Sequence, residues 1–120
     1  MSINLDDLDE EVRKKVINLQ NQSTTMEFLT NQKIQLESAL REVEIAIEEL
    51  GKINPDEVVY KSIGGILVKS EKNKLLDEKK SLKVTLEMRT KTLSQKLERT
   101  KSQIETLRKS IQSDLQNKRA

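Results

Sequence analysis

A seven-residue repeat of apolar side chains runs through the first half of this chain and limits the folds open to it. Eleven of its fourteen positions are apolar: Leu5, Leu8, Val12, Lys15, Leu19, Gln22, Met26, Leu29, Lys33, Leu36, Leu40, Val43, Ile47 and Leu50. The spacing alternates between three and four residues and continues over about six heptads without Pro or Gly, which predicts a coiled-coil helix. Gly51 suits a left-handed helix end and Pro55 prevents the helix from resuming, so residues 1–51 are expected to form the first helical segment.

The C-terminal part of the chain repeats this design less regularly. Seven of the twelve positions of its seam are apolar: Leu76, Lys79, Lys83, Leu86, Thr90, Leu93, Leu97, Thr100, Ile104, Leu107, Ile111 and Asp114. Ser70 is expected to cap the start of this helix, because its hydroxyl accepts a hydrogen bond from an otherwise unpaired amide of the first turn. Residues 70–120 are therefore expected to form a second helix of nearly the same length as the first.

The connector between the helices determines their relative direction. A helix of about 45 residues is roughly 68 Å long, and a connector of about 19 residues spans that distance only when nearly fully extended. The helices are therefore expected to run antiparallel. A compact globular core is not expected, because 34% of the residues are hydrophobic, 35% are charged, and Phe28 and Tyr60 are the only aromatic residues. The predicted fold class is mainly α: a long antiparallel two-helix coiled coil joined by a single β-hairpin.

The net charge of +2 hides opposite charges in the two halves of the chain. Residues 1–60 contain 13 acidic and 6 basic side chains, whereas residues 61–120 contain 7 acidic and 16 basic ones. One interpretation is two solvated helix faces of different composition. The other is attraction between halves that lie side by side, which the antiparallel pairing favours. Each exposed ion pair contributes only about 0.2–1 kcal/mol, so the pattern concerns partner choice more than stability.

Residues 52–69 carry the signal of the β-hairpin. Two runs rich in β-branched residues, Val-Val-Tyr-Lys-Ser-Ile at 58–63 and Ile-Leu-Val-Lys at 66–69, flank Gly64-Gly65. A tight two-residue turn requires positive φ angles, which glycine adopts readily. If this turn sets the register, one face carries Val59, Lys61, Ile63, Ile66 and Val68, and the other carries Val58, Tyr60, Ser62, Leu67 and Lys69.

This hairpin is expected to be incomplete in a single chain. A two-stranded sheet is marginal in water, and this one has two partly apolar faces and two unpaired edges. The economical solution is oligomerisation, in which strands of several chains build a shared sheet or barrel; the alternative is a hairpin that folds back on its own helices. The residues expected to form the assembly surface are Val58, Val59, Tyr60, Ile63, Gly64, Gly65, Ile66, Leu67 and Val68.

The sequence lacks the usual residues of catalytic and metal sites. There is no His and no Cys, so the commonest general base, a thiol nucleophile and the usual zinc ligands are missing. Neighbouring carboxylates such as Glu48 and Glu49 are explained by solvated helix faces, and Gly64-Gly65 lacks the flanking residues of a phosphate-binding loop. We therefore expect no enzymatic activity, no metal and no cofactor.

Membrane and nucleic-acid partners are also not expected. No apolar run approaches the roughly 20 residues of a membrane span, and the acidic N-terminus has no signal-peptide pattern, so we expect a cytoplasmic protein. The basic second half raises nucleic-acid binding as an alternative. Acidic residues of the first half neutralise much of this charge, however, and no aromatic side chains accompany it for base stacking.

The ends of the two helices are a candidate binding region for unfolded proteins, which are called clients below. Near residues 1–20 and 104–120, apolar side chains exceed what one seam requires, and Lys15 and Asp114 weaken the seam itself. Fraying would expose adaptable apolar surface for unfolded chains; the alternative is that these residues simply close the coiled coil. The candidate client-binding residues are Ile3, Leu5, Leu8, Val12, Val16, Ile17, Ile111 and Leu115.

Two segments of the sequence resemble the β-type subunit of prefoldin. They are residues 31–42 (Asn-Gln-Lys-Ile-Gln-Leu-Glu-Ser-Ala-Leu-Arg-Glu) and the more specific residues 58–69 of the hairpin. The single hairpin fits the β type, because the longer α type carries two. The short chain resembles archaeal subunits, and eukaryotic subunits share the layout. The resemblance implies a hexamer of two α and four β subunits, with a β-barrel body of pooled hairpins and coiled-coil tentacles. It also implies that the tentacle tips hold unfolded client proteins and pass them to a group II chaperonin.

Two functions from different classes follow from these features. The first is a subunit of an ATP-independent holdase chaperone, favoured by the hairpin and by the surplus apolar residues at the helix ends. The second is a structural coiled-coil spacer that tethers fixed partners. A spacer is expected to keep a regular seam to its ends, whereas a holdase is expected to bind many unfolded chains.

Overall fold

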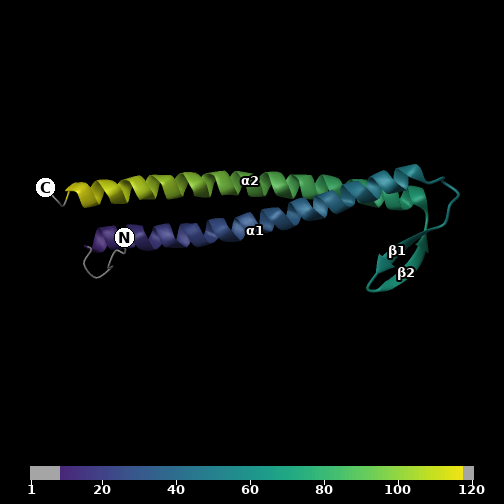
Figure 1. Ribbon diagram of the computed structural model, residues 1–120, viewed down its shortest axis with the longest axis horizontal. Coiled ribbons are helices and arrows are strands. Elements are labelled where there is room, and N and C mark those ends of the chain that lie inside the picture. The colour runs from purple at the N-terminus through teal and green to yellow at the C-terminus, as the bar shows by residue number, and fades with distance from the viewer. Residues whose placement is uncertain (1–8, 118–120) are drawn as a thin grey trace. The chain divides into compact units, whose positions relative to one another are not determined.

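Two long α-helices and one β-hairpin make up the computed structural model, which describes residues 9–117 (Figure 1). In chain order the elements are α1 (Glu10–Lys52), β1 (Val59–Ile63), β2 (Ile66–Ser70) and α2 (Lys72–Asn117). The predicted class, mainly α with a single hairpin between two long helices, is confirmed. Neither helix within the described residues combines the length and the apolarity that crossing a membrane requires.

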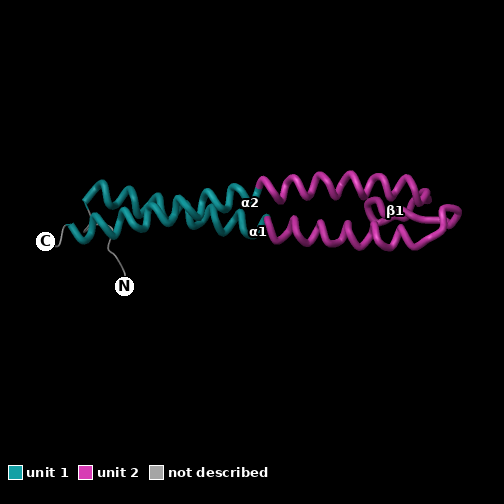
Figure 2. The backbone as a smooth tube through the Cα atoms, turned by 90° about the horizontal axis from the view of Figure 1, so that it is seen from above, with its two compact units in different colours: residues 1–32, 93–120 teal, residues 33–92 magenta. Residues whose placement is uncertain are grey.

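The chain divides into two compact units, each with a stretch of both helices (Figure 2). Unit 1 combines the chain up to Gln32 with the chain from Leu93 onward, and unit 2 covers Lys33–Thr92. Unit 1 thus contains the start of α1 and the end of α2, whereas unit 2 contains the end of α1, the hairpin and the start of α2. Within each unit the two helical stretches run antiparallel, as the short connector predicted.

The seam predicted from the sequence forms the inside of the helix pair in each unit. All of its positions between residues 12 and 50 and between residues 76 and 114 are buried or half-buried. Lysines of the seam such as Lys33 and Lys83 are half-buried, because a long alkyl stem can lie along apolar surface while the ammonium stays in water. The buried apolar residues are Val12, Leu29, Leu93, Ile104 and Ile111 in unit 1 and Val43, Leu75 and Leu86 in unit 2.

Helix α1 starts with a side-chain cap that the sequence analysis missed. Asp9 Oδ1 accepts a hydrogen bond from the Val12 amide at 3.0 Å, and the Asp9 carbonyl accepts one from the Arg13 amide at 3.0 Å. Asp9 therefore occupies the N-cap position, and the acidic residues Glu10 and Glu11 of the first turn suit the positive end of the helix dipole. The signal was present in the sequence as an aspartate directly before two glutamates.

Helix α1 ends at Lys52, and Gly51 does not end it. The expectation of a left-handed Gly51 is wrong, because Gly51 lies inside the helix and has no positive φ. The helix stops before Asn54, because a residue that precedes proline is disfavoured in helical conformation. Residues 54–57 instead form a turn, in which the Glu57 amide donates to the Asn54 carbonyl at 3.1 Å.

The hairpin adopts the predicted register around its glycine turn. Gly64 has a φ of 52° and Gly65 a φ of 84°, and a Cβ atom at either position would have nothing within 4 Å. These glycines are thus required by backbone conformation and not by close packing, as in a two-residue turn of type I′. The pairs along the antiparallel ladder are Val59 with Ser70, Tyr60 with Lys69, Lys61 with Val68, Ser62 with Leu67, and Ile63 with Ile66.

Helix α2 begins one residue after the hairpin and is not capped by Ser70. That expectation is wrong, because Ser70 is the last residue of β2 and the Glu71 carbonyl accepts the first helical hydrogen bond, from the Leu75 amide at 3.0 Å. The start of α2 is tied to the end of α1 by the Lys72 ammonium, which donates to the Ile53 carbonyl. The strand pairing therefore continues to the residue that was expected to begin the helix.

One ion pair in unit 2 joins the hairpin to its own helix. Lys61 Nζ of β1 donates to Glu78 Oε2 of α2 at 2.8 Å. This hydrogen bond is the main reason why the pKa of the Glu78 carboxyl lies below the ordinary 4.5; partial desolvation opposes the shift, and the positive charges of Lys61, Lys74 and Lys79 add to it. The pair links the middle of the hairpin to the second turn of α2.

Removal of the Asp9 cap is expected to loosen the first turn of α1. Asp9→Ala leaves the Val12 amide without its side-chain acceptor, which costs about 1 kcal/mol of helix stability. Amide hydrogen exchange over residues 10–13 measures this as faster exchange. Asp9→Asn is the matched control, because it keeps an oxygen acceptor; equal exchange in the two variants would contradict the capping role.

Acid is expected to release the hairpin from α2. Because the pKa of Glu78 is lower in the folded chain than in the unfolded chain, the ion pair stabilises the fold fully above pH 4.5. The contribution is lost as the pH falls through the lower folded-state pKa. An NMR titration of the Glu78 carboxyl carbon measures this directly, and Lys61→Met is expected to raise the midpoint. An unchanged midpoint in Lys61→Met would show that the hydrogen bond does not cause the shift.

Candidate functional site

The apolar side chains of the hairpin are open to solvent in the single chain. Apart from Val59, their exposed fractions range from 40% at Val68 to 72% at Leu67. Contiguous apolar surface of this kind is normally covered by a partner. The exposed members of the expected assembly surface are Val58, Tyr60, Ile63, Gly64, Gly65, Ile66, Leu67 and Val68, and Val59 is half-buried.

Both faces of the hairpin carry this exposed apolar surface. The register places Ile63, Ile66 and Val68 on one face, and Tyr60 and Leu67 on the other. A sheet with one apolar face can be completed by a single helix layer, whereas a sheet with two needs cover on both sides. The helices of unit 2 leave apolar side chains of both faces exposed.

The two edges of the hairpin are also unpaired within the described residues. The sheet contains β1 and β2 alone, so each strand has one hydrogen-bonded neighbour and one free edge. A free edge offers a row of amide and carbonyl groups to any further strand. Edges and faces together make the hairpin an unfinished sheet.

The alternative in which the hairpin folds back to bury itself does not describe this structure. Its link to α2 is the polar contact between Lys61 and Glu78, whose side chains are themselves 44% and 39% exposed. The apolar side chains of the strands gain little cover from that contact, because they remain exposed. The ion pair orients the hairpin without completing it.

The helix ends in unit 1 form the second candidate surface, and the expected client-binding residues differ in exposure there. Val12 and Ile111 are buried, at 2% and 6% exposed. Val16 and Leu115 are half-buried, and Ile17 is 43% exposed. The remaining three candidates, Ile3, Leu5 and Leu8, lie outside the described residues. The seam is thus closed at Val12 and Ile111, and Ile17 is the described candidate that offers open apolar surface.

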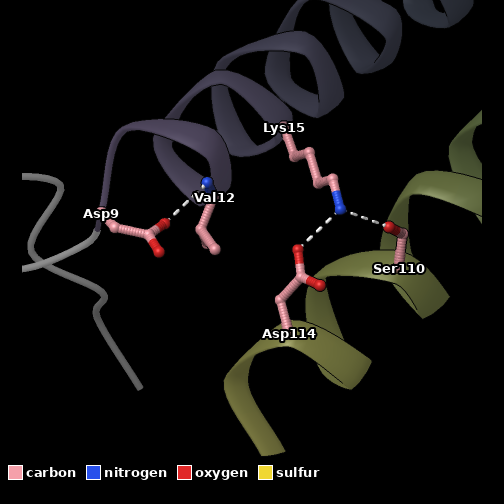
Figure 3. Close-up of polar contacts among 5 residues, drawn as sticks. All are labelled: Asp9, Val12, Lys15, Ser110 and Asp114. Atoms are coloured by element: carbon pink, nitrogen blue, oxygen red, sulfur yellow. Dashed lines mark hydrogen bonds and ion pairs between the residues drawn. The ribbon is translucent and has the colours of Figure 1, made fainter. Parts of the chain in front are cut away.

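The polar seam residues Lys15 and Asp114 pair with each other across the two helices. Lys15 Nζ lies 2.6 Å from Asp114 Oδ2 and 2.8 Å from Ser110 Oγ (Figure 3). The hydrogen bond to Asp114 is the main cause that raises the pKa of the Lys15 ammonium, and burial opposes it. The expectation that these two residues only weaken the seam is therefore corrected: each supplies the partner of the other.

Sequence reasoning missed this pair because it treated the two seams separately. In an antiparallel helix pair, early positions of the first seam face late positions of the second. The sequence did contain a signal for this pair, because Lys15 and Asp114 lie near opposite ends of the chain and antiparallel helices bring those ends together. The base comes from the acidic half and the acid from the basic half, so the pair runs against the overall charge asymmetry.

Other exposed apolar residues are scattered along the helices. They do not lie on the seam, and exposed apolar residues are ordinary on protein surfaces. Among residues 9–117 no group of three or more His, Cys, Asp or Glu side chains is placed to hold a metal ion. The scattered residues are Phe28, Ile34, Ile45, Leu82, Val84 and Met88.

Known proteins share this arrangement over nearly the whole chain. A sequence family described as "Prefoldin subunit" matches residues 4–118. The prefoldin subunit beta of Archaeoglobus fulgidus is 33% identical over 107 residues, which cover 89% of this chain and 92% of the relative. The prefoldin subunit beta of Pyrobaculum islandicum is 39% identical over 83 residues, which cover 69% of this chain and 66% of the relative.

A solved structure agrees with these sequence relatives. The crystal structure of the prefoldin beta subunit from Thermococcus strain KS-1 superposes with a TM-score of 0.82 and 28% identity, covering 91% of this chain and 96% of that chain. Long helices joined by one hairpin, together with a family match over residues 4–118, leave no ambiguity about ancestry. The chain belongs to the prefoldin subunit family, in which it is similar to the beta subunits.

Proposed function

We propose that this chain is a subunit of an ATP-independent chaperone, which assembles through its hairpin and holds unfolded proteins at the ends of its helix pair. The observation that carries the proposal is the unfinished hairpin, with exposed apolar side chains on both faces and a free edge on each strand. A chain with such a surface functions as part of a larger body.

The partners are other prefoldin subunits. Strands contributed by neighbouring chains pair with the edges of β1 and β2 and cover Tyr60 and Leu67 on one face and Ile66 and Val68 on the other. A hexamer of two α-type and four β-type subunits, with the hairpins pooled into a β-barrel body, satisfies both needs. The hairpin of β1 and β2 then assembles the complex, and α1 and α2 form the coiled-coil arm.

The clients are unfolded proteins in the cytoplasm, and a group II chaperonin receives them. Holding needs apolar surface that adapts to many sequences and no chemical step, which is consistent with a chain that has neither His nor Cys. The client-binding residues are those at the helix ends, with Ile17 as the exposed member and Val12 and Ile111 available when the ends separate.

The coiled-coil spacer remains the second candidate, because one observation favours it. Burial of Val12 and Ile111 and pairing of Lys15 with Asp114 keep the seam closed close to the described ends of both helices. A spacer needs such a seam and binds folded partners in fixed ratio. A holdase binds chemically unfolded proteins of unrelated sequence and does not bind their folded forms.

A comparison of three proteins tests assembly and holding separately, each mixed with an α-type prefoldin subunit. Replacing Ile63, Ile66 and Val68 with Ser is expected to release free subunits in size-exclusion chromatography with light scattering, because the strands lose apolar cover. Removing about ten residues from each end is expected to leave the complex intact and to reduce suppression of aggregation of a denatured model protein. The unaltered chain is expected to assemble and to hold.

Replacement of Ile34, Ile45 and Val84 with Ser is the matched control for the hairpin variant, because these three residues are also apolar and exposed but lie on the helices. An unchanged complex in the hairpin variant would refute assembly through the hairpin. Full holding activity in the truncated protein, with the complex intact, would move client binding away from the helix ends. Binding of one folded partner in fixed ratio, with no effect on aggregation, would favour the spacer.

A further inference from the structure

The polar contact between the helices in unit 1 lies next to the most deeply buried apolar residues of that end. Lys15 follows Val12 by three residues on α1, and Asp114 follows Ile111 by three residues on α2. Side chains three residues apart lie on one face of a helix. Val12 and Ile111 therefore share the inner faces of their helices with Lys15 and Asp114. Figure 3 shows the polar pair joining the two helices near Val12.

This pair holds the helices together less tightly than an apolar pair at the same positions. The side chains of Lys15 and Asp114 are 25% and 28% exposed, so water competes for both charged groups. A polar pair in a coiled-coil seam fixes register at a cost in stability relative to packed apolar side chains. Removal of one partner is worse than either arrangement, because it leaves a half-buried charge unpaired.

The position of the pair makes local opening possible without disruption of the whole unit. α2 ends at Asn117, three residues after Asp114, and α1 begins at Glu10, five residues before Lys15. Among the described residues, separation of the helices as far as this pair breaks the contacts of little more than one turn on each helix and frees Val12. One further turn of separation, past Asp114, frees Ile111. Short helix ends open with a small fraction of the free energy of global unfolding.

We propose that the Lys15–Asp114 pair is a latch, which sets how often the helix ends separate and thereby how often Val12 and Ile111 become available to an apolar segment of an unfolded chain. This inference rests on the proposed holding function and adds a contact that regulates client binding. Val12 and Ile111 are closed in the resting structure and act as client-binding residues only in the open one. Ser110 supports the closed form, because its hydroxyl is the second group bonded to the Lys15 ammonium.

Four variants of the full chain, each assembled with an α-type subunit, test the latch. Asp114→Ala removes one partner and is expected to speed amide hydrogen exchange over residues 11–16 and 108–114 by about fivefold. The double variant K15L/D114L replaces the latch with an apolar pair and is expected to slow the same exchange by a similar factor. The reversed pair K15D/D114K is expected to stay within about twofold of the unaltered protein. Lys33→Leu changes a half-buried seam lysine in unit 2 and is expected to leave exchange at the helix ends unchanged.

Capture of a chemically denatured model protein is measured on the same samples, with the mass of the complex and the helix content by circular dichroism as controls. Capture is expected to follow opening: higher in Asp114→Ala, unchanged in the reversed pair and in Lys33→Leu, and about fivefold lower in K15L/D114L. K15L/D114L is the decisive variant, because a more apolar seam keeps it folded.

Each other outcome has a distinct meaning. Slowed exchange with unchanged capture in K15L/D114L would overturn the latch and leave holding by already exposed residues such as Ile17. Unchanged exchange in both K15L/D114L and Asp114→Ala would overturn it as well, because the pair would not control opening. An unaltered protein that captures no denatured chain would instead overturn the proposed function.

Discussion

A sheet of two strands does not bury enough surface to be stable by itself, and this constraint governs the rest of the molecule. The hairpin of residues 59–70 leaves apolar side chains exposed on both faces and has an unpaired edge on each strand. Its register is nevertheless well defined, because two glycines with positive φ fix the turn. The ion pair of Lys61 with Glu78 orients the hairpin relative to α2. The element is thus ordered for assembly and left without the cover that assembly provides.

The helices solve a different physical problem. A narrow apolar seam holds two charged helices together with few aromatic residues, so that each unit has a thin core and much solvated surface. At the ends in unit 1 the seam contains the polar pair of Lys15 and Asp114. Stable apolar packing and an openable end make opposite demands on such a seam. A paired polar contact meets both demands, because it preserves the register of the two helices and keeps small the free energy needed to separate their ends.

The sequence alone predicted the features that depend on periodic or local patterns. The heptad repeat predicted the two long helices, and the short connector predicted their antiparallel direction. Gly64-Gly65 predicted the hairpin with its register and the contents of its two faces. The ends of the elements were predicted less well. Gly51 stayed helical because the nearby Asn54-Pro55 already stops α1, and Ser70 joined β2 because strand pairing continued to it.

Contacts between distant parts of the chain were the least predictable. Lys15 and Asp114 each looked like a defect of one seam, and only the register between the helices shows that they pair. The exposure of Ile17 beside the buried Val12 likewise depends on how α1 is rotated toward α2. Such details follow from side-chain directions in three dimensions, which spacing along one helix does not contain.

Hydrogen exchange at the outer edges of the hairpin tests most directly whether partner chains complete this sheet. With a two-residue turn, Ile63 and Ile66 are the bonded pair nearest the turn, so alternation directs the amides of Tyr60, Ser62, Leu67 and Lys69 outward. These four amides are expected to exchange rapidly in the isolated chain at low concentration and to be protected in the complex with an α-type subunit. Equally rapid exchange in the complex would contradict strand pairing between subunits, and protection in the isolated chain would contradict the incompleteness of the hairpin.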